Sequence, residues 1–151
     1  MLKGISPLIP PKLLCAMDEM GHGDTLVIAD ANFPAESVGK NSLVIRCDGH
    51  GGAELLRAIL ALMPLDQYVD NPVTLMAKVP GDTVESPIWD TYAQLVARVD
   101  DRGAATIGMA DRFPFSEKAS KAYVVVATGE RAQYANVILQ KGVVYEGEAL
   151  A

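Results

Sequence analysis

The chain has 151 residues, half of them hydrophobic and 21% charged, which suits a globular domain with a sizeable core and argues against disorder. Acidic residues outnumber basic residues by 19 to 13, a balance that argues against a nucleic-acid or anionic-membrane surface. No apolar run reaches the roughly 18 to 20 residues that cross a bilayer, and the first residues lack a signal-peptide pattern. Cys15 and Cys47, without a CxxC motif, indicate neither a disulfide framework nor a zinc site. We therefore expect a cytoplasmic protein without a metal centre.

The first half of the chain alternates between helical and extended patterns. Pro11 precedes apolar residues at helical spacing, which predicts a helix over 12–20 that ends at the following glycines. Short apolar runs over 25–29 and 41–47 predict two buried strands. The apolar residues of segment 53–63 share one helical face, so a helix is expected there.

The second half continues the alternation. Helices are expected over 89–99 and 114–122, and strands over 73–79, 104–110, 123–127, 137–139 and 143–145. The strands are near-continuous apolar runs, which is typical of a sheet covered on both faces. The sequence therefore predicts one domain over 1–151, with a three-layer α/β/α fold and a mixed central sheet.

His22 lies between two glycines just before the first predicted strand. Flanking glycines let the backbone expose the ring, and an exposed imidazole can exchange a proton near neutral pH. The alternative is a histidine that merely occupies the loop at the helix C-terminus. Spacing alone favours that alternative, because a lone histidine is weak evidence of catalysis.

Asp30 directly follows the first predicted strand. Open α/β sheets collect ligand-binding groups at this end of a strand, and a carboxylate there could accept hydrogen bonds from the hydroxyls of a sugar. The side chain could equally cap the turn that follows it.

Three further polar side chains follow predicted strands. The planar fork of Arg112 could orient a polyol or an anion, or the residue could pair with Asp111 or Glu117 at the surface. Tyr134 and Asn136 are two residues apart, so they share one side of an extended segment. Tyr134 could stack on a sugar ring, or it could be an amphipathic tyrosine at a sheet edge.

A glycine-rich stretch, Asp48-Gly49-His50-Gly51-Gly52, precedes the helix expected over 53–63. Glycines before a helix N-terminus can admit a phosphate to backbone N–H groups, as in a nucleotide- or phosphate-binding regulator. Neither GxGxxG nor GxxxxGK[ST] is present, so a tight turn is the favoured interpretation. A metal centre that joins His22 and His50 lacks a ligand spacing that would support it.

Taken in order, several segments resemble the RbsD/FucU family of sugar mutarotases, and in particular its FucU branch. The resemblance spans nearly the whole chain and rests on MLKGISPLI at 1–9, MGHGD at 20–24, DANFPA at 30–35, DRF at 111–113, TGERAQYAN at 128–136 and KGV at 141–143. It implies an RbsD-like fold and interconversion of the α and β anomers of a monosaccharide without a cofactor. L-fucose is the implied sugar, with D-ribose or another aldose as alternatives. A non-catalytic sugar-binding or transport-accessory protein is a competing interpretation.

The resemblance also implies roles for individual residues. His22 would be the acid/base residue, and the implied substrate contacts are Asp30, Arg112, Tyr134, the backbone of Ala135, and Asn136. Two positions depart from common family residues, because this chain has Ser116 where close relatives often carry tyrosine and Asn32 where some carry histidine. These departures bear on sugar preference more than on the type of reaction.

His22 and Asp30 flank the same predicted strand. A strand from Asp24 to Asp30 would span about 20 Å at 3.3 Å per residue, which is too far for one monosaccharide to bridge. Either the strand is short or bent, or each site takes residues from two subunits. The family resemblance implies ring-like decamers with sites at subunit contacts. We therefore expect a homo-oligomer in which Tyr134 and Asn136 reach a neighbour's pocket.

Overall fold

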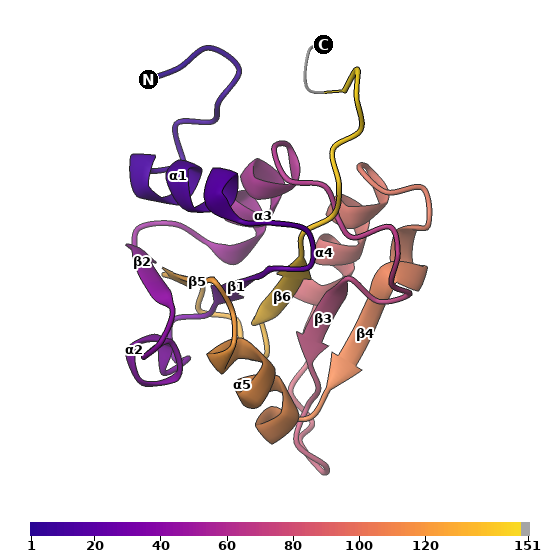
Figure 1. Cartoon of the computed structure of the whole chain (residues 1–151). Helices are drawn as coiled ribbons and strands as arrows, with labels where there is room; N and C mark the ends of the chain where they lie inside the picture. The colour runs from indigo at the N-terminus through magenta and orange to yellow at the C-terminus, as the bar shows by residue number, and fades with distance from the viewer. Residues whose placement is uncertain (149–151) are drawn as a thin grey trace.

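Six strands form one mixed sheet in the computed structural model, which describes residues 1–148 (Figure 1). The strands are β1 (Thr25–Ala29), β2 (Leu43–Cys47), β3 (Val73–Met76), β4 (Ile107–Ala110), β5 (Val124–Thr128) and β6 (Val137–Gln140). The helices are α1 (Pro11–Glu19), α2 (Ala35–Val38), α3 (Gly52–Leu60), α4 (Ile88–Ala97) and α5 (Arg112–Ser120), with a 3-10 turn at Gly103–Thr106. None of these helices is long and apolar enough to cross a membrane.

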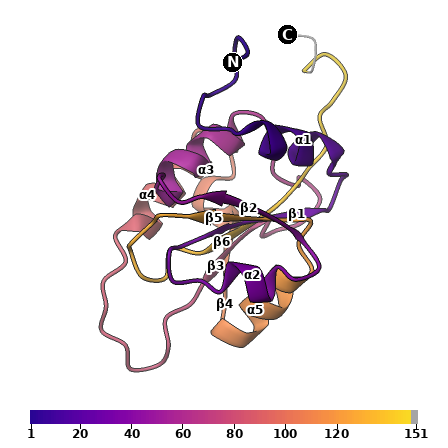
Figure 2. The ribbon, with the colours of Figure 1, turned by 90° about the vertical axis from the view of Figure 1, so that its left-hand side faces the viewer.

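Helices cover both faces of the sheet, which confirms the predicted three-layer fold. Figure 2 shows α1, α3 and α4 on one face and α2 and α5 on the other. Successive strand residues point to opposite faces, so Leu26 and Ile28 pack in the core under α1 and α3, whereas Val27 and Ala29 pack against Phe115 of α5. The four residues from Leu26 to Ala29 are fully buried, which explains why this part of β1 is apolar at every position.

The direction of β6 determines which loops meet at one edge of the sheet. The strand order is β2-β5-β1-β6-β3-β4, and β6 is antiparallel to both of its neighbours, while the other pairs are parallel. The start of β6 therefore lies beside the carboxyl ends of β1 and β3, at the same edge of the sheet as the carboxyl end of β4. We call this side of the sheet the carboxyl edge.

Two local predictions are wrong, and one short helix has no signal in the sequence. Segment 143–145 is not a strand, because the side-chain amide of Gln67 bonds both the N–H (3.1 Å) and the carbonyl (2.9 Å) of Val143 in place of a neighbouring strand. The start of segment 104–110 belongs to the 3-10 turn, which Thr106 closes through a hydroxyl bond to the Gly103 carbonyl. The four-residue helix α2 was not predicted, since so short a segment shows no helical periodicity.

Candidate functional site

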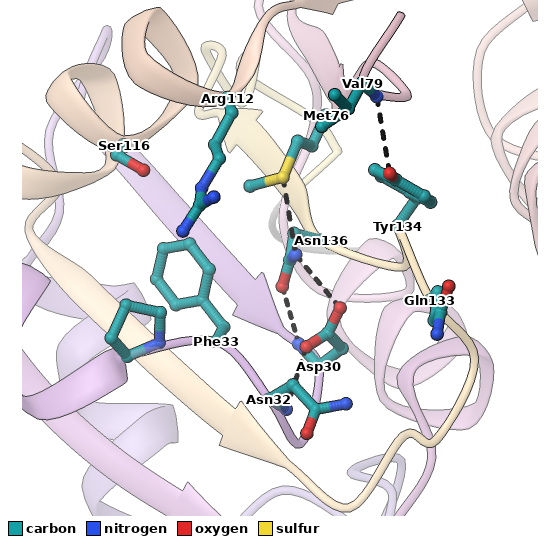
Figure 3. Close-up of a pocket in the computed structure, with 11 residues that line it drawn as sticks. Asp30, Asn32, Phe33, Met76, Val79, Arg112, Ser116, Gln133, Tyr134 and Asn136 are labelled. Carbon is teal, nitrogen blue, oxygen red and sulfur yellow. Dashed lines mark hydrogen bonds between the residues drawn. The ribbon is translucent and has the colours of Figure 1, made fainter. Parts of the chain in front are cut away.

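A pocket of about 320 Å³ opens at the carboxyl edge of the sheet, and this volume is within the range of small-molecule sites. Its wall is part polar and part apolar (Figure 3). The lining side chains are Asp30, Asn32, Phe33, Pro34, Met76, Val79, Arg112, Ser116, Gln133, Tyr134 and Asn136. Four of the five predicted substrate-contact residues are thus brought together within one chain.

Asp30 and Asn136 form the buried floor of this pocket. The Asp30 N–H donates to Asn136 Oδ1 (2.7 Å), and Asn136 Nδ2 donates back to Asp30 Oδ2 (3.0 Å). The Asn32 N–H donates to Asp30 Oδ1 (2.9 Å), so the carboxyl group caps the following turn as well as facing the pocket. Burial raises the pKa of Asp30, and these hydrogen bonds act in the opposite direction.

Arg112 supplies the positive charge of the pocket. It is the first residue of α5, and its side chain extends towards the ring of Phe33 (Figure 3). Within residues 1–148 it forms no ion pair with Asp111 or Glu117, and its guanidinium carbon lies 5.9 Å from the centroid of the Phe113 ring. Its hydrogen-bond donors therefore face a pocket whose floor carries a carboxyl group, an arrangement that can bind a polyhydroxylated molecule.

Tyr134 lies at the rim of the pocket and has an uncommon backbone conformation. Its φ is +58°, which costs a non-glycine residue about 1 to 2 kcal/mol. Its hydroxyl donates to the carboxylate of Asp82 and accepts the Val79 N–H (3.3 Å), so it links the pocket to the loop over 77–87. The bond to Asp82 raises the pKa of Tyr134.

Two aromatic side chains of α4 bond the backbone of Tyr134 and Ala135 on the side away from the pocket. Trp89 Nε1 donates to the carbonyl of Tyr134 (2.8 Å), and the buried Tyr92 hydroxyl donates to the carbonyl of Ala135 (2.9 Å). Trp89 is therefore a support for the pocket segment, in addition to packing against the core. Ala135 is itself buried behind the wall, and its carbonyl is already occupied by Tyr92.

His22 lies at the opposite edge of the sheet and does not line the pocket. Its Nε2 is 3.0 Å from Oδ1 of Asp66, and its ring centroid is 5.4 Å from that of Tyr68. Almost half of the His22 side chain is exposed, whereas the Asp66 side chain is buried.

The expectation that Tyr134 and Asn136 reach a neighbour's pocket is wrong. Asn136 is buried against Asp30 of its own chain, and Tyr134 lines the same pocket. The β1–β6 pairing explains this, because Ile28 lies opposite Val137 and so brings the residues next to them together. Of the residues implied as site members, His22 is the one that the chain keeps apart from its own pocket.

The glycine-rich stretch before α3 does not leave its N–H groups open to a phosphate. The Gly51 N–H donates to Oε1 of Glu54 (2.9 Å), and the Gly52 N–H donates to Oε2 of Glu130 (3.0 Å). Two carboxylates thus bond the N–H groups of Gly51 and Gly52 at the helix N-terminus, which favours the tight turn over the phosphate-binding interpretation. Among residues 1–148, no three His, Cys, Asp or Glu side chains are grouped so that they could hold a metal ion.

Sequence reasoning did not find the apolar wall of the pocket, which consists of Phe33, Met76 and Val79. Phe33 lies within the DANFPA motif, in which the aspartate carries the signal for binding, whereas Met76 and Val79 have the pattern of ordinary strand residues. Asp66 and Asp82, the partners of His22 and Tyr134, were not found either, because single aspartates in loops carry no signal of their own.

The fold and the pocket define an α/β protein with a part-polar pocket of small-molecule size at the carboxyl edge of a mixed sheet. The chain belongs to the RbsD / FucU transport protein family, which matches residues 3–144. The family resemblance seen in the sequence is therefore confirmed.

Relatives match the chain almost from end to end. The L-fucose mutarotase of Actinobacillus pleuropneumoniae serotype 5b is 48% identical over 95% of this chain and 97% of its own length. The crystal structure of FucU from Bifidobacterium longum has a TM-score of 0.94 and 65% identity, and covers 95% of this chain and 100% of that chain. The fucose mutarotase of Streptococcus pneumoniae, solved in complex with L-fucose, has a TM-score of 0.90 and 48% identity over the same shares.

Proposed function

We propose that this protein is an L-fucose mutarotase, which interconverts the α and β anomers by opening and closing the sugar ring. The observation that carries the proposal is the gathering of Asp30, Arg112, Tyr134 and Asn136 around one pocket of monosaccharide size. The names of the near full-length relatives, one of them solved with L-fucose bound, support the same sugar. The family match over 3–144 and the shared sheet support treating the chain as one domain.

The pocket suits a sugar because it offers acceptors, donors and apolar surface together. Asp30 has lone pairs left beside its bonds to Asn32 and Asn136, and these can accept sugar hydroxyls. The guanidinium of Arg112 can donate to hydroxyl or ring oxygens. Phe33 and Met76 present apolar surface to the C–H face or the methyl group of the sugar.

Mutarotation requires two proton transfers. The anomeric hydroxyl loses its proton as the C1–O1 bond becomes a carbonyl, and the ring oxygen gains a proton as the C1–O5 bond breaks. Rotation about C1–C2 and reversal of these steps give the other anomer, so no redox cofactor is consumed. We assign one of these transfers to His22, and a positioned histidine contributes about 10² to 10⁴-fold. The other transfer is open to water, to Tyr134 or to a second hydroxyl of the substrate.

Because His22 lies at the far edge of the sheet, we propose that the His22 of one protomer completes the pocket of a neighbour in a homo-oligomer, with a decamer as the expected assembly. An exposed aromatic residue beside His22 supports a contact there, since Tyr68 flanks the His22 ring and is 69% exposed. Native mass spectrometry gives the subunit number. A fully active monomer would contradict this part of the proposal.

The decisive experiment is exchange NMR on the anomers of L-fucose with wild type, with His22→Ala and without protein, and D-ribose as the competing sugar. Faster fucose exchange that is lost in His22→Ala supports mutarotation through His22. Binding shifts without faster exchange would instead favour a non-catalytic sugar-binding protein.

We also infer a cytoplasmic location, because Cys15 and Cys47 are free thiols, as is usual in reducing compartments. Cell fractionation tests this inference.

A further inference from the structure

The carboxylate of Asp66 is built into the fold at the edge of the sheet opposite the pocket. Its Oδ1 accepts the Tyr68 N–H (2.9 Å), and its Oδ2 accepts Nε2 of Gln140 (3.0 Å) at the end of β6. The carbonyl of Asp66 accepts a bond from Arg102 (2.9 Å), which holds the backbone as well. These bonds leave the carboxylate little freedom to turn, and its side chain is only 2% exposed.

The remaining partner of this carboxylate is His22. Its Nε2 lies 3.0 Å from Asp66 Oδ1, and the Tyr68 ring flanks the imidazole. Hydrogen bonds from Tyr68, His22 and Gln140 together lower the pKa of Asp66 despite its burial. Asp66 is therefore an ionised group near neutral pH, and an ionised carboxylate can only accept hydrogen bonds.

An acceptor at Oδ1 determines which nitrogen of His22 carries the proton. Nε2 must donate, so the neutral ring has its proton on Nε2 and its lone pair on Nδ1. Nδ1 forms no hydrogen bond within residues 1–148. The partly exposed ring thus offers a single nitrogen to a ligand.

We propose that Asp66 is a positioning residue that fixes the neutral ring of His22 as its Nε2–H tautomer, so that Nδ1 is the atom that exchanges a proton with the sugar. The inference rests on the proposed function, in which His22 reaches the pocket of a neighbour. It deepens that function by naming the reacting nitrogen and the residue that orients it.

The proton balance is the same in both directions of the reaction. When neutral His22 acts as the base, Nδ1 takes the proton of the anomeric hydroxyl, the O–H electron pair forms the C1=O1 bond, and the C1–O5 pair moves to the ring oxygen. The ring oxygen takes its proton from a water molecule, which is left as hydroxide, and on ring closure the O5 hydroxyl returns its proton to that hydroxide. In the reverse step the imidazolium returns its proton from Nδ1. Throughout the cycle the proton on Nε2 stays between His22 and Asp66, whose negative charge stabilises the imidazolium.

The tautomer can be measured without any activity assay. In wild-type protein labelled with ¹⁵N histidine, at a pH where the rings are neutral, the ¹⁵N shifts of His22 should show a bare Nδ1 and a protonated Nε2. His50 provides an internal contrast, because its Nδ1 lies 3.1 Å from Oε1 of Glu54 and should be the protonated nitrogen. The His50→Gln variant retains only the ¹⁵N histidine signals of His22, so it assigns the two sets of signals to their residues. A protonated Nδ1 in His22 would overturn the proposal.

Asp66→Asn tests the effect on catalysis. The variant keeps an oxygen for Tyr68 and His22, and the amide of Gln140 can turn to accept its new N–H group, so the fold should persist. Loss of the charge should lower kcat about 10- to 100-fold and leave KM nearly unchanged. A purely structural bond would not produce this split between kcat and KM. Asp24→Asn is the matched control, since that exposed carboxylate bonds the Gly21 N–H (2.8 Å) and should keep wild-type kcat.

The outcomes separate the two proposals. Wild-type kcat in a folded Asp66→Asn, which keeps the oxygen that accepts the Nε2–H, would overturn the role of the Asp66 charge in stabilising the imidazolium. A protonated Nδ1 in the ¹⁵N spectrum would overturn the tautomer, and either result would leave the mutarotase proposal intact. If wild-type protein fails to accelerate fucose exchange, the proposed function fails, and with it the assignment of Nδ1 as the reacting atom. The ¹⁵N shifts would then show whether Asp66 fixes the tautomer in a protein that lacks the reaction.

Discussion

His22 and Asp30 lie at opposite ends of the same strand, β1, whose five residues separate the turn before it from the pocket after it. At about 3.3 Å per residue, the strand alone keeps the two side chains much farther apart than the width of a monosaccharide. Asp30 has its pocket partners in its own chain, and His22 does not. A shared site follows if His22 acts on the sugar.

Mixed assemblies test this arrangement through complementation. His22→Ala and Arg112→Ala should each abolish fucose exchange, the first by removing the proton-transfer group and the second by removing a substrate contact. Protomers co-expressed in equal amounts should regain about one quarter of wild-type activity, because random assembly places an intact His22 beside an intact pocket in that share of sites. Exchange NMR on the purified mixture gives the recovery. Activity no higher than that of the two parents would argue that each site lies within one chain.

The two buried carboxyl groups should affect stability with opposite dependence on pH. Burial raises the pKa of Asp30, so its contribution is most favourable below the unfolded pKa and is lost as pH rises through the folded value. Hydrogen bonds lower the pKa of Asp66, so its contribution is present above the unfolded pKa and is lost as pH falls through the folded value. Relative to wild type, Asp30→Asn should therefore gain stability as the pH rises from acid to neutral, and Asp66→Asn should lose it.

Urea unfolding at a series of pH values and one protein concentration measures these differences, since the concentration must be held constant for an oligomer. If the free energies of unfolding of both variants changed with pH in parallel with that of wild type, neither pKa shift would be present in the folded protein.

The same Asp30→Asn protein should bind L-fucose about 10- to 100-fold more weakly, because a hydrogen bond to a charged acceptor is lost. Calorimetry checks the affinity.

The hydroxyl of Tyr134 should control the order of the loop over 77–87. Tyr134→Phe removes the acceptor of the Val79 N–H and the donor to Asp82, so the Val79 amide should exchange with solvent faster than in wild type. Hydrogen-exchange NMR measures this amide directly. Tyr123→Phe is a suitable control, because its hydroxyl bonds Glu19 at the opposite edge of the sheet and should leave Val79 unchanged. Unaltered exchange in Tyr134→Phe would mean that other contacts hold the loop.

The sequence predicted the sheet well because its central strands are buried on both faces and therefore appear as uninterrupted apolar runs. The same reasoning located Asp30, since a polar residue directly after a buried strand lies at an edge where ligands bind. Segment 143–145 looks like a strand for the same reason, yet its backbone bonds the side chain of Gln67. Local pattern cannot distinguish these two partners, because the partner is 76 residues away.

The pairs that build the site were beyond sequence reasoning for a related reason. Asn136 meets Asp30 across 106 positions, and His22 meets Asp66 across 44, so both contacts depend on which strands become neighbours. The antiparallel insertion of β6 between β1 and β3 creates the first contact and brings Gln140 to the second. Apolar periodicity predicts that β6 exists, but it does not specify the place of β6 in the sheet.

Gly52→Ala should link core packing to the pocket. A Cβ at this position would lie 2.2 Å from the hydroxyl oxygen of Tyr92, which is fully buried and cannot move aside without losing its bond to the carbonyl of Ala135. We expect a loss of about 1 to 3 kcal/mol in the free energy of unfolding, together with weaker fucose binding, because the segment that carries Tyr134 shifts. Gly49→Ala has no heavy atom within 4 Å of its Cβ and should be nearly neutral.

A double variant identifies the cause of this loss. Tyr92→Phe removes the oxygen that the new methyl group meets, so Gly52→Ala should destabilise the Tyr92→Phe background less than it destabilises wild type. Urea unfolding of the four proteins gives the coupling energy, and fucose titration of the same samples shows whether binding recovers with stability. The hydroxyl bond to Ala135 is absent in both Phe variants, so binding should recover only in part. If the two substitutions changed the free energy of unfolding additively, the new methyl group at position 52 would not be clashing with the Tyr92 hydroxyl.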